Sequence, residues 1–283
     1  MTTILDGKKL RDKIIENLKA KVDTFEEKPT LVVILVGENP ASKIYVNNKK
    51  KMAEKIGIHS EVINYPANIT EAELLDKIEE LNNNKKVTAI LVQLPLPKHI
   101  SKDNVMNKII PSKDVDGFTP YNFGKLFSGE TPTVYPCTPK GILLLLDEYN
   151  IEIEGKHVVI VGRSNIVGKP LSQMMLNKNA TVTICHSHTK NLSQITKTAD
   201  ILVSAVGKNI IEGEMLKTDC VIVDVGIFKD ENGKTRGDVD FESASKIASF
   251  ISPVPGGVGP MTIASLMLNR GTFWKEFSIT TIY

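Results

Sequence analysis

The chain has 283 residues, of which 41% are hydrophobic and 24% are charged, so its composition is that of a globular protein and excludes a disordered or fibrous one. At roughly 150 residues per domain, this length predicts about two domains. The 35 basic and 33 acidic residues leave a net charge of +2, too small a basic excess to hold a nucleic acid by counterion release.

The first 120 residues alternate between strand and helix patterns. Apolar residues at helical spacing predict an amphipathic helix between Leu5 and Val22. Strands are then expected at 30–37, 60–65 and 88–94, and helices at 40–56 and from the Thr70–Glu73 capping box to Asn82. Repeated β-α-β units with short connections predict a parallel sheet with helices on both faces.

A turn-rich stretch from Tyr121 to Pro139 precedes a second series of the same kind. Helices are predicted at 139–149, 168–177 and 260–269, and strands at 157–161, 180–185, 201–205, 221–225 and 248–251. The predicted fold class is therefore α/β with two doubly wound parallel-sheet domains, at 1–138 and 139–269.

The cysteines and the amino-terminal segment bear on location. Cys137, Cys185 and Cys220 lie far apart without a C-x-x-C pair, which excludes a disulfide framework and a cysteine zinc site. No apolar run approaches the roughly 20 residues of a membrane span. The first 21 residues lack the apolar core of a signal peptide. We expect a soluble, cytoplasmic protein with no nucleic-acid or membrane partner.

A glycine-bounded loop, Gly162-Arg163-Ser164-Asn165-Ile166-Val167-Gly168, joins a predicted strand to a predicted helix. The first glycine lets the backbone turn sharply, and the helix N-terminus offers unpaired N–H groups to a pyrophosphate. The loop departs from G-x-G-x-x-G because Ser164 replaces the second glycine. A tight turn that binds no ligand is therefore an alternative for this loop by itself.

The end of the following strand favours NADP over NAD. NAD sites place an acidic residue about 20 residues after the loop, where it binds the ribose 2′-hydroxyl. Here His186-Ser187-His188-Thr189-Lys190 contains no carboxylate, and Arg163 can face the same spot. Hydroxyl, imidazole and guanidinium groups suit a 2′-phosphate, so this domain is predicted to be Rossmann-like and to bind NADP. His186 and His188 also have the spacing of a zinc pair, but no third ligand stands nearby, and we expect no metal.

The helix predicted after the first long strand carries Tyr45 and Lys49, which share one helix face. A lysine near an aromatic ring at the carboxyl edge of a parallel sheet can donate or accept a proton. The alternative is an ordinary solvated face, which we favour for Lys50 and Lys51. Gln93 ends an apolar strand at the same edge, where it needs hydrogen-bond partners from backbone or ligand.

Two loops add candidate ligand contacts. Asp114 and Asp116 precede Gly117, as a carboxylate pair or as an ordinary turn. The segment from Ser252 to Thr262 has two prolines that fix the chain and three glycines that allow close backbone contact with a flat ligand. A stiff turn is the alternative, but the glycines before a helix N-terminus favour a ligand contact.

Together these segments resemble the bifunctional methylenetetrahydrofolate dehydrogenase/methenyltetrahydrofolate cyclohydrolase family. The matching motifs run in family order across nearly the whole chain: Ser42-x-x-Tyr45-Val46-x-x-Lys49, Val92-Gln93-Leu94-Pro95-Leu96-Pro97, Lys113-Asp114-Val115-Asp116-Gly117, Pro136-Cys137-Thr138-Pro139, the loop from Gly162 to Gly168, Asp224-Val225-Gly226-Ile227, and 253–262. The resemblance implies NADP-dependent oxidation of 5,10-methylenetetrahydrofolate and hydrolysis of the 5,10-methenyl product to 10-formyltetrahydrofolate. It also implies a homodimer.

The resemblance further implies the roles of individual residues. Lys49 would shuttle a proton in the hydrolysis, and Gln93 would orient it. Tyr45 would stack on the aminobenzoyl ring, and Asp116 would bind the pterin edge. The remaining folate contacts would be Val92, Leu94, Pro255, Gly256, Gly257, Val258 and Gly259. The NADP contacts would be Gly162, Arg163, Ser164, Ser187 and Ile227.

The chain departs from the family after Asn269, where the last helix usually continues. Gly271 should end or weaken that helix, and we expect the tail, 270–283, to pack on the first domain.

Three other functions are possible. The Tyr-x-x-x-Lys spacing also occurs in short-chain dehydrogenases, but there it follows the glycine-rich loop, whereas Tyr45 precedes it. Another two-domain NADP-dependent dehydrogenase, such as one acting on shikimate, is disfavoured by the motifs at 92–97 and 253–262. A non-enzymatic NADP sensor would need neither Lys49 nor Gln93.

Overall fold

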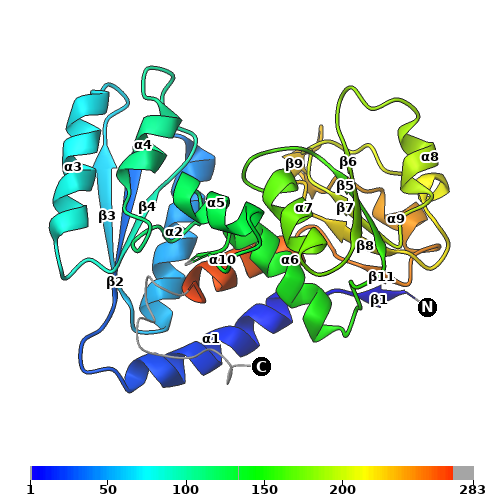
Figure 1. The fold of residues 1–283 in the computed structure, drawn as a ribbon, viewed down its shortest axis with the longest axis horizontal. Coiled ribbons are helices and arrows are strands. Elements are labelled where there is room, and N and C mark those ends of the chain that lie inside the picture. The colour runs from blue at the N-terminus through cyan, green and yellow to red at the C-terminus, as the bar shows by residue number, and fades with distance from the viewer. Residues whose placement is uncertain (1, 133, 270–283) are drawn as a thin grey trace. The chain divides into compact units, whose positions relative to one another are not determined.

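The computed structural model describes residues 2–132 and 134–269. These residues form two compact units, described separately below. The three-strand unit comprises 13–135 with 266–269, and the six-strand unit comprises 2–12 with 136–265. Both contain a parallel sheet flanked by helices, so the predicted α/β fold class is confirmed (Figure 1).

In the three-strand unit, the sheet has the order β3-β2-β4 with all strands parallel. The strands are β2 (Thr30–Val36), β3 (His59–Tyr65) and β4 (Ala89–Val92), and the helices are α2 (Pro40–Lys55), α3 (Glu71–Asn83), α4 (Lys102–Lys108) and α5 (Pro120–Phe127), with most of α1 (Gly7–Asp23). The central strand β2 is buried on both faces, as its unbroken apolar run predicts.

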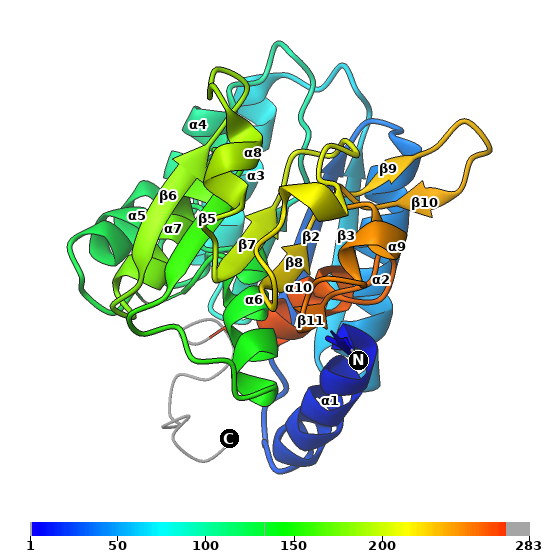
Figure 2. The ribbon, with the colours of Figure 1, turned by 90° about the vertical axis from the view of Figure 1, so that its right-hand side faces the viewer.

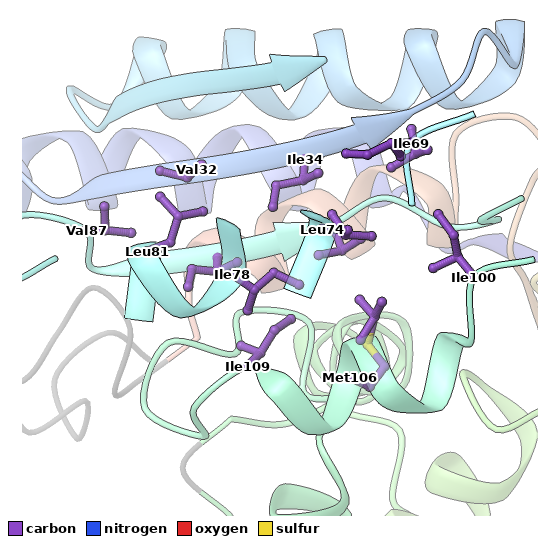
Figure 3. Close-up of a cluster of buried hydrophobic side chains, with 14 residues drawn as sticks. Val32, Ile34, Ile69, Leu74, Ile78, Leu81, Val87, Ile100, Met106 and Ile109 are labelled. Carbon is purple, nitrogen blue, oxygen red and sulfur yellow. The ribbon is translucent and has the colours of Figure 1, made fainter. Parts of the chain in front are cut away.

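Apolar side chains at helical spacing attach α3 to one face of this sheet. Leu74, Ile78 and Leu81 are fully or almost fully buried, and they pack with Ile34 of β2 and Met106 of α4 (Figure 3). The helix α2 packs on β2 and β3 through its own buried stripe. The chain therefore runs from β2 to β3 and back past β2 to β4, which leaves the carboxyl ends of β2 and β4 beside each other.

The six-strand unit has a fully parallel sheet of order β1-β11-β8-β7-β5-β6 (Figure 2). Its strands are β1 (Thr3–Ile4), β5 (His157–Val161), β6 (Thr181–Cys185), β7 (Ile201–Ser204), β8 (Val221–Asp224) and β11 (Phe250–Ile251). Its helices are α6 (Cys137–Glu148), α7 (Gly168–Leu176), α8 (Leu192–Thr196), α9 (Phe241–Ala244) and α10 (Val258–Met267), although the last two residues of α10 are grouped with the three-strand unit. The strand order reverses between β5 and β7, and ligands of such sheets bind at this reversal.

The structure differs from the predicted domain boundaries at both ends of the first domain. Residues 2–12 belong to the six-strand unit, because Thr3 and Ile4 form β1 beside β11. A strand of two residues carries no periodicity that a sequence can reveal. The second boundary lies between Tyr135 and Pro136, and the predicted tail at 270–283 lies outside the described residues.

Several short elements were not predicted. The stretch expected to be turn-rich contains α5, which begins at Pro120 after Thr119, whose hydroxyl accepts a hydrogen bond from Asn122 N. The other missed elements are α4, α8, α9, the 3-10 helix Gly213–Met215 and the antiparallel pair β9 (Phe228–Lys229) and β10 (Thr235–Arg236).

Within 2–132 and 134–269, no helix combines the length and apolar character needed to cross a membrane. The three cysteines, all in this part of the chain, are buried and free of disulfide bonds.

Candidate active site

Lys49 and Gln93 meet at the carboxyl edge of the three-strand sheet. Lys49 is only 8% exposed, and its Nζ donates a hydrogen bond of 3.2 Å to Gln93 Oε1. Gln93 directly follows β4, and its backbone N donates to Ile34 O of β2 at 2.9 Å. Its Nε2 donates to Leu94 O at 2.8 Å, so the side-chain oxygen is left facing the lysine. The amide is thus held in the one orientation that offers an acceptor to Lys49.

The local sequence explains why Lys49 is buried within a run of polar residues. The helix α2 begins after Asn39, whose side chain accepts a hydrogen bond from Ser42 N. Its buried residues, Ser42, Val46, Lys49 and Ala53, recur at helical spacing and face the sheet. Lys51 is exposed, as expected for a solvated face, whereas Lys50 is half-buried outside that stripe and pairs with Glu54 at 3.8 Å.

Tyr45 lies one helical turn before Lys49, with 44% of its surface exposed. Its ring is therefore available for contact with a ligand. Val92, the last residue of β4, is buried, and Leu94 is half-buried.

Asp116 belongs to a segment that begins beside β4. Asp114 forms a parallel bridge with Ile90, and Ile90 N donates to Lys113 O at 2.8 Å. Asp116 follows two residues later, within the turn from Asp114 to Gly117, and its side chain is half-buried.

Buried polar groups hold this segment, and Asp114 takes the turn role that the sequence analysis gave as an alternative to a ligand-binding carboxylate pair. Asp114, buried, accepts hydrogen bonds from Gly117 N at 2.8 Å, Thr119 N at 2.9 Å and Asn122 Nδ2 at 3.0 Å. The spacing of Asp114 to Gly117 is the only local signal for this turn. Lys113, also buried, donates to three carbonyls at the end of α3, those of Leu81, Asn82 and Asn84, at 2.7–2.8 Å. Nothing in the local sequence predicts that contact.

The glycine-bounded loop follows β5 of the six-strand unit. Gly162 has a φ of +130°, and a Cβ there would lie 2.6 Å from Ala205 O, so only glycine fits without a shift. Ser164 closes the loop, because Val167 N donates to its Oγ at 3.2 Å and Lys169 N to its carbonyl at 3.1 Å. The side chains of Arg163 and Ser164 are exposed beside the N-terminus of α7.

The turn after β6 presents Ser187 to solvent, and Ile227, after β8, is 48% exposed. His188 N donates to His186 Nδ1 at 3.1 Å, which commits that ring nitrogen to the turn. No group of three potential metal ligands occurs in the described ranges.

The segment Pro255–Gly259 also belongs to the six-strand unit, together with the predicted cofactor contacts. Lys8 N donates to Gly256 O at 3.1 Å, and Gly257 N donates to Pro253 O at 2.8 Å, so the glycine loop is pinned against the start of α1. Pro255 and Gly259 are exposed, whereas Gly257 and Val258 are buried. The predicted folate contacts are thus divided between the two units.

Comparison with known proteins identifies the family. A family model described as the tetrahydrofolate dehydrogenase/cyclohydrolase catalytic domain matches residues 5–116, and the NAD(P)-binding domain of the same family matches residues 136–277. The chain belongs to the tetrahydrofolate dehydrogenase/cyclohydrolase family. The resemblance stated from the motifs is therefore confirmed.

Relatives of this family resemble the chain over nearly its whole length. The bifunctional protein FolD of Ligilactobacillus salivarius is 54% identical over 271 residues, which cover 94% of this chain and 95% of that protein. The crystal structure of FolD from Campylobacter jejuni has a TM-score of 0.94 at 51% identity and covers 95% of this chain and 97% of that one. The Trypanosoma brucei FolD, solved with NADP cofactor and an inhibitor, has a TM-score of 0.91 at 36% identity, with 95% of each chain covered.

Proposed function

We propose that the chain catalyses the NADP-dependent oxidation of 5,10-methylenetetrahydrofolate and the hydrolysis of the resulting 5,10-methenyl cation to 10-formyltetrahydrofolate. Membership of the family supports both reactions. The observation that carries the hydrolysis is the buried Lys49 amine hydrogen-bonded to Gln93 at the sheet edge. An NADP sensor has no use for that pair, and the motifs at 92–97 and 253–262 disfavour a dehydrogenase acting on shikimate.

The oxidation removes a hydride from the methylene carbon, and NADP supplies the acceptor for it. This step depends on orientation rather than on acid–base chemistry. We assign Tyr45 to stacking on the aminobenzoyl ring and Asp116 to the amino and N–H edge of the pterin. The folate contacts at Val92, Leu94 and the five residues Pro255, Gly256, Gly257, Val258 and Gly259 complete the proposed binding set.

The hydrolysis needs a proton carrier. Water adds to the methenyl carbon, and the bond from that carbon to N5 of the folate breaks. One proton of the water passes to N5 and the other leaves to solvent. We assign the transfer to Lys49 Nζ, which takes the proton from the attacking water and returns it to N5. Gln93 acts as the positioning residue because its fixed oxygen holds the amine in place.

The six-strand unit is proposed to hold NADP at the reversal of its strand order. The backbone at Gly162 and the N-terminus of α7 suit the pyrophosphate. The exposed Arg163, Ser164 and Ser187 suit the 2′-phosphate, and the exposed Ile227 offers an apolar contact. The donor set contains no carboxylate that would repel the phosphate, which supports NADP as the cofactor.

The assignment of Lys49 is tested by supplying 5,10-methenyltetrahydrofolate without cofactor and following its absorbance. The wild-type protein should accelerate the decay, and Lys49→Met should abolish that acceleration while still binding NADP. Lys50→Met is the matched control, because it makes the same change one residue along, outside the buried stripe of α2, and should keep wild-type activity. Undiminished decay with Lys49→Met would rule out the assignment.

We further propose a cytoplasmic homodimer. Three buried cysteines without disulfide bonds support a reducing compartment. The net charge of +2 is too small a basic excess to hold a nucleic acid, so we propose no nucleic-acid partner. Sedimentation equilibrium tests this proposal. A homodimer should have twice the mass of the single chain at micromolar concentration.

A further inference from the structure

Two buried aspartates lie at the carboxyl edge of the six-strand sheet, outside the residue roles proposed above. Asp224 ends β8 with 4% of its surface exposed, and Asp238 follows β10 with 0% exposed. Burying a carboxylate costs several kcal/mol unless hydrogen bonds compensate it. Each of these carboxylates accepts three such bonds, and all but one of the donors are backbone N–H groups.

Asp238 holds the loop that follows β7. Its Oδ2 accepts hydrogen bonds from Ser204 Oγ at 2.9 Å and Val206 N at 2.7 Å, and its Oδ1 accepts from Lys208 N at 2.8 Å. One side chain, 30–34 residues away along the sequence, thus anchors the end of β7 at Ser204 and two residues of the loop, Val206 and Lys208.

Asp224 holds the loop that follows β8 and also the segment that carries Asp238. Its Oδ1 accepts hydrogen bonds from Gly226 N at 3.1 Å and Asp238 N at 2.9 Å, and its Oδ2 accepts from Val239 N at 3.0 Å. The carboxylate of Asp224 therefore fixes the backbone that carries Asp238, and Asp238 in turn fixes the loop after β7.

Two glycines lie directly against these carboxylates. A Cβ on Gly226, in the loop after β8, would lie 1.7 Å from Asp238 Oδ1, and a Cβ on Gly237, in the segment that carries Asp238, would lie 2.0 Å from Asp224 Oδ2. Neither position has room for a side chain, so the loop after β8 and the Asp238 segment pack tightly on the two aspartates.

The braced loops adjoin the proposed NADP contacts. Ala205 O is the atom that excludes a side chain at Gly162, and Ala205 N donates to Val161 O at 2.8 Å. On its other side, the loop 205–208 approaches Ile227: a Cβ placed on Gly207 would lie 3.9 Å from Ile227 O. The loop 205–208 is thus flanked by Gly162 and Ile227.

The strand order shows which part of the cofactor these loops face. In dinucleotide sites, the acidic or phosphate-binding position that reads the adenosine ribose lies at the end of the strand after the glycine loop, which here is β6. The adenosine half therefore lies over β5 and β6. The other half crosses the reversal toward β7 and β8, whose loops Asp238 and Asp224 hold.

We propose that Asp224 and Asp238 are positioning residues for the nicotinamide half of NADP, through the loops 205–208 and 225–227. The inference rests on the proposed function. The carboxylates act through the loops rather than on the cofactor, because both are almost fully buried and each accepts three hydrogen bonds from the protein. They fix the backbone and the exposed side chains of Val206 and Ile227 in the arrangement that receives that half.

The test compares Asp238→Asn with the wild-type protein. Asparagine keeps the shape but turns an NH₂ group toward N–H donors that need an acceptor. The Kd of NADP should rise by about tenfold, the change expected when a buried hydrogen-bonding group loses its partner. The Kd of adenosine 2′,5′-bisphosphate, which represents the adenosine half alone, should stay within about twofold of the wild-type value by the same reasoning. The KM for the methylene substrate and the cofactor-free decay of the methenyl substrate should not change.

Two further variants keep the test decisive if Asp238→Asn folds poorly. Ser204→Ala removes one donor to Asp238 and should give a smaller rise in the same direction. Asp200→Asn is the matched control in the same unit, because Asp200 binds His157 N and Lys217 at the amino edge of the sheet. It should leave both affinities unchanged.

Equal losses of NADP and bisphosphate affinity, or no loss of either, would overturn the inference. Both results are distinct from failure of the proposed function, in which the wild-type protein itself would neither bind NADP nor hydrolyse the methenyl substrate.

Discussion

Replacing Asp224 by asparagine should remove a pH dependence from the stability of the six-strand unit. Burial raises the pKa of Asp224 from 3.8 to about 7, and the nearby Asp238 carboxylate adds to the rise, against the lowering effect of the N–H groups of Asp238, Val239 and Gly226. The carboxyl group therefore binds its proton more tightly in the folded protein than in the unfolded chain. This tighter proton binding stabilises the folded protein. The stabilisation is fully present below pH 3.8 and is lost as the pH rises through about 7.

The magnitude follows from the size of the pKa shift. A rise from 3.8 to about 7 corresponds to roughly 4 kcal/mol in total, of which about 2 to 3 kcal/mol is lost between pH 5 and pH 8. The asparagine side chain of the variant carries no charge at either pH. The wild-type protein should therefore lose about that much stability relative to Asp224→Asn over this interval.

Urea unfolding followed by circular dichroism at several pH values measures the effect. All other titrating groups are shared, so the difference between the two proteins isolates Asp224. Asp240→Asn serves as a control: a hydrogen bond with Ser243 lowers the pKa of Asp240, so its contribution is lost only on acidification below this interval. Parallel wild-type and Asp224→Asn curves from pH 5 to pH 8 would refute the reasoning.

Three more predictions follow from single contacts. Lys113→Met should lower the free energy of unfolding by about 3 kcal/mol, because three carbonyls at the end of α3 lose their donor, and urea unfolding of the variant measures this. Gly162→Ala should weaken NADP binding at least tenfold, about 1.4 kcal/mol, because the new Cβ meets Ala205 O at 2.6 Å; calorimetric titration checks it, and unchanged affinity would contradict the loop assignment. Thr70→Ala should destabilise the three-strand unit by about 1 kcal/mol through loss of the capping box with Glu73, seen as a lower thermal midpoint, whereas Thr70→Ser should retain it.

The parts of the fold that the sequence predicts are those with a local physical cause. The run Thr30–Val36 is apolar at every position but the first, so it indicates a strand buried on both faces. The hydroxyl of Thr70 and the carboxylate of Glu73 cap their helix within four residues. The turn at Gly162 likewise depends on the backbone at that residue and on the strand and helix that flank it.

The parts that could not be predicted depend on residues distant in sequence. The strand β1 has two residues and exists because β11, nearly 250 residues later, offers it an edge. Asp238 binds donors from another strand's loop, and Lys113 binds the end of a helix about 30 residues earlier. Periodicity and turn signals act over a few residues, so they contain no information about these contacts.

The candidate site likewise combines residues that the local sequence singles out with contacts between residues distant in sequence. Lys49 is singled out by its spacing from Tyr45, but the run Asn47–Lys51 looks solvated, and only the buried stripe of α2 separates Lys49 from Lys50. The hydrogen bond to Gln93 links residues 44 apart and requires the strand order of the sheet to be known.

The most direct measurement of the central claim mixes 5,10-methylenetetrahydrofolate with NADP and follows NADPH and the methenyl intermediate together. With the wild-type protein, NADPH should form while the methenyl species stays low, because hydrolysis removes it. With Lys49→Met, NADPH should still form and the methenyl species should accumulate to a matching amount. Clearance of the methenyl species by Lys49→Met at the wild-type rate would contradict the account.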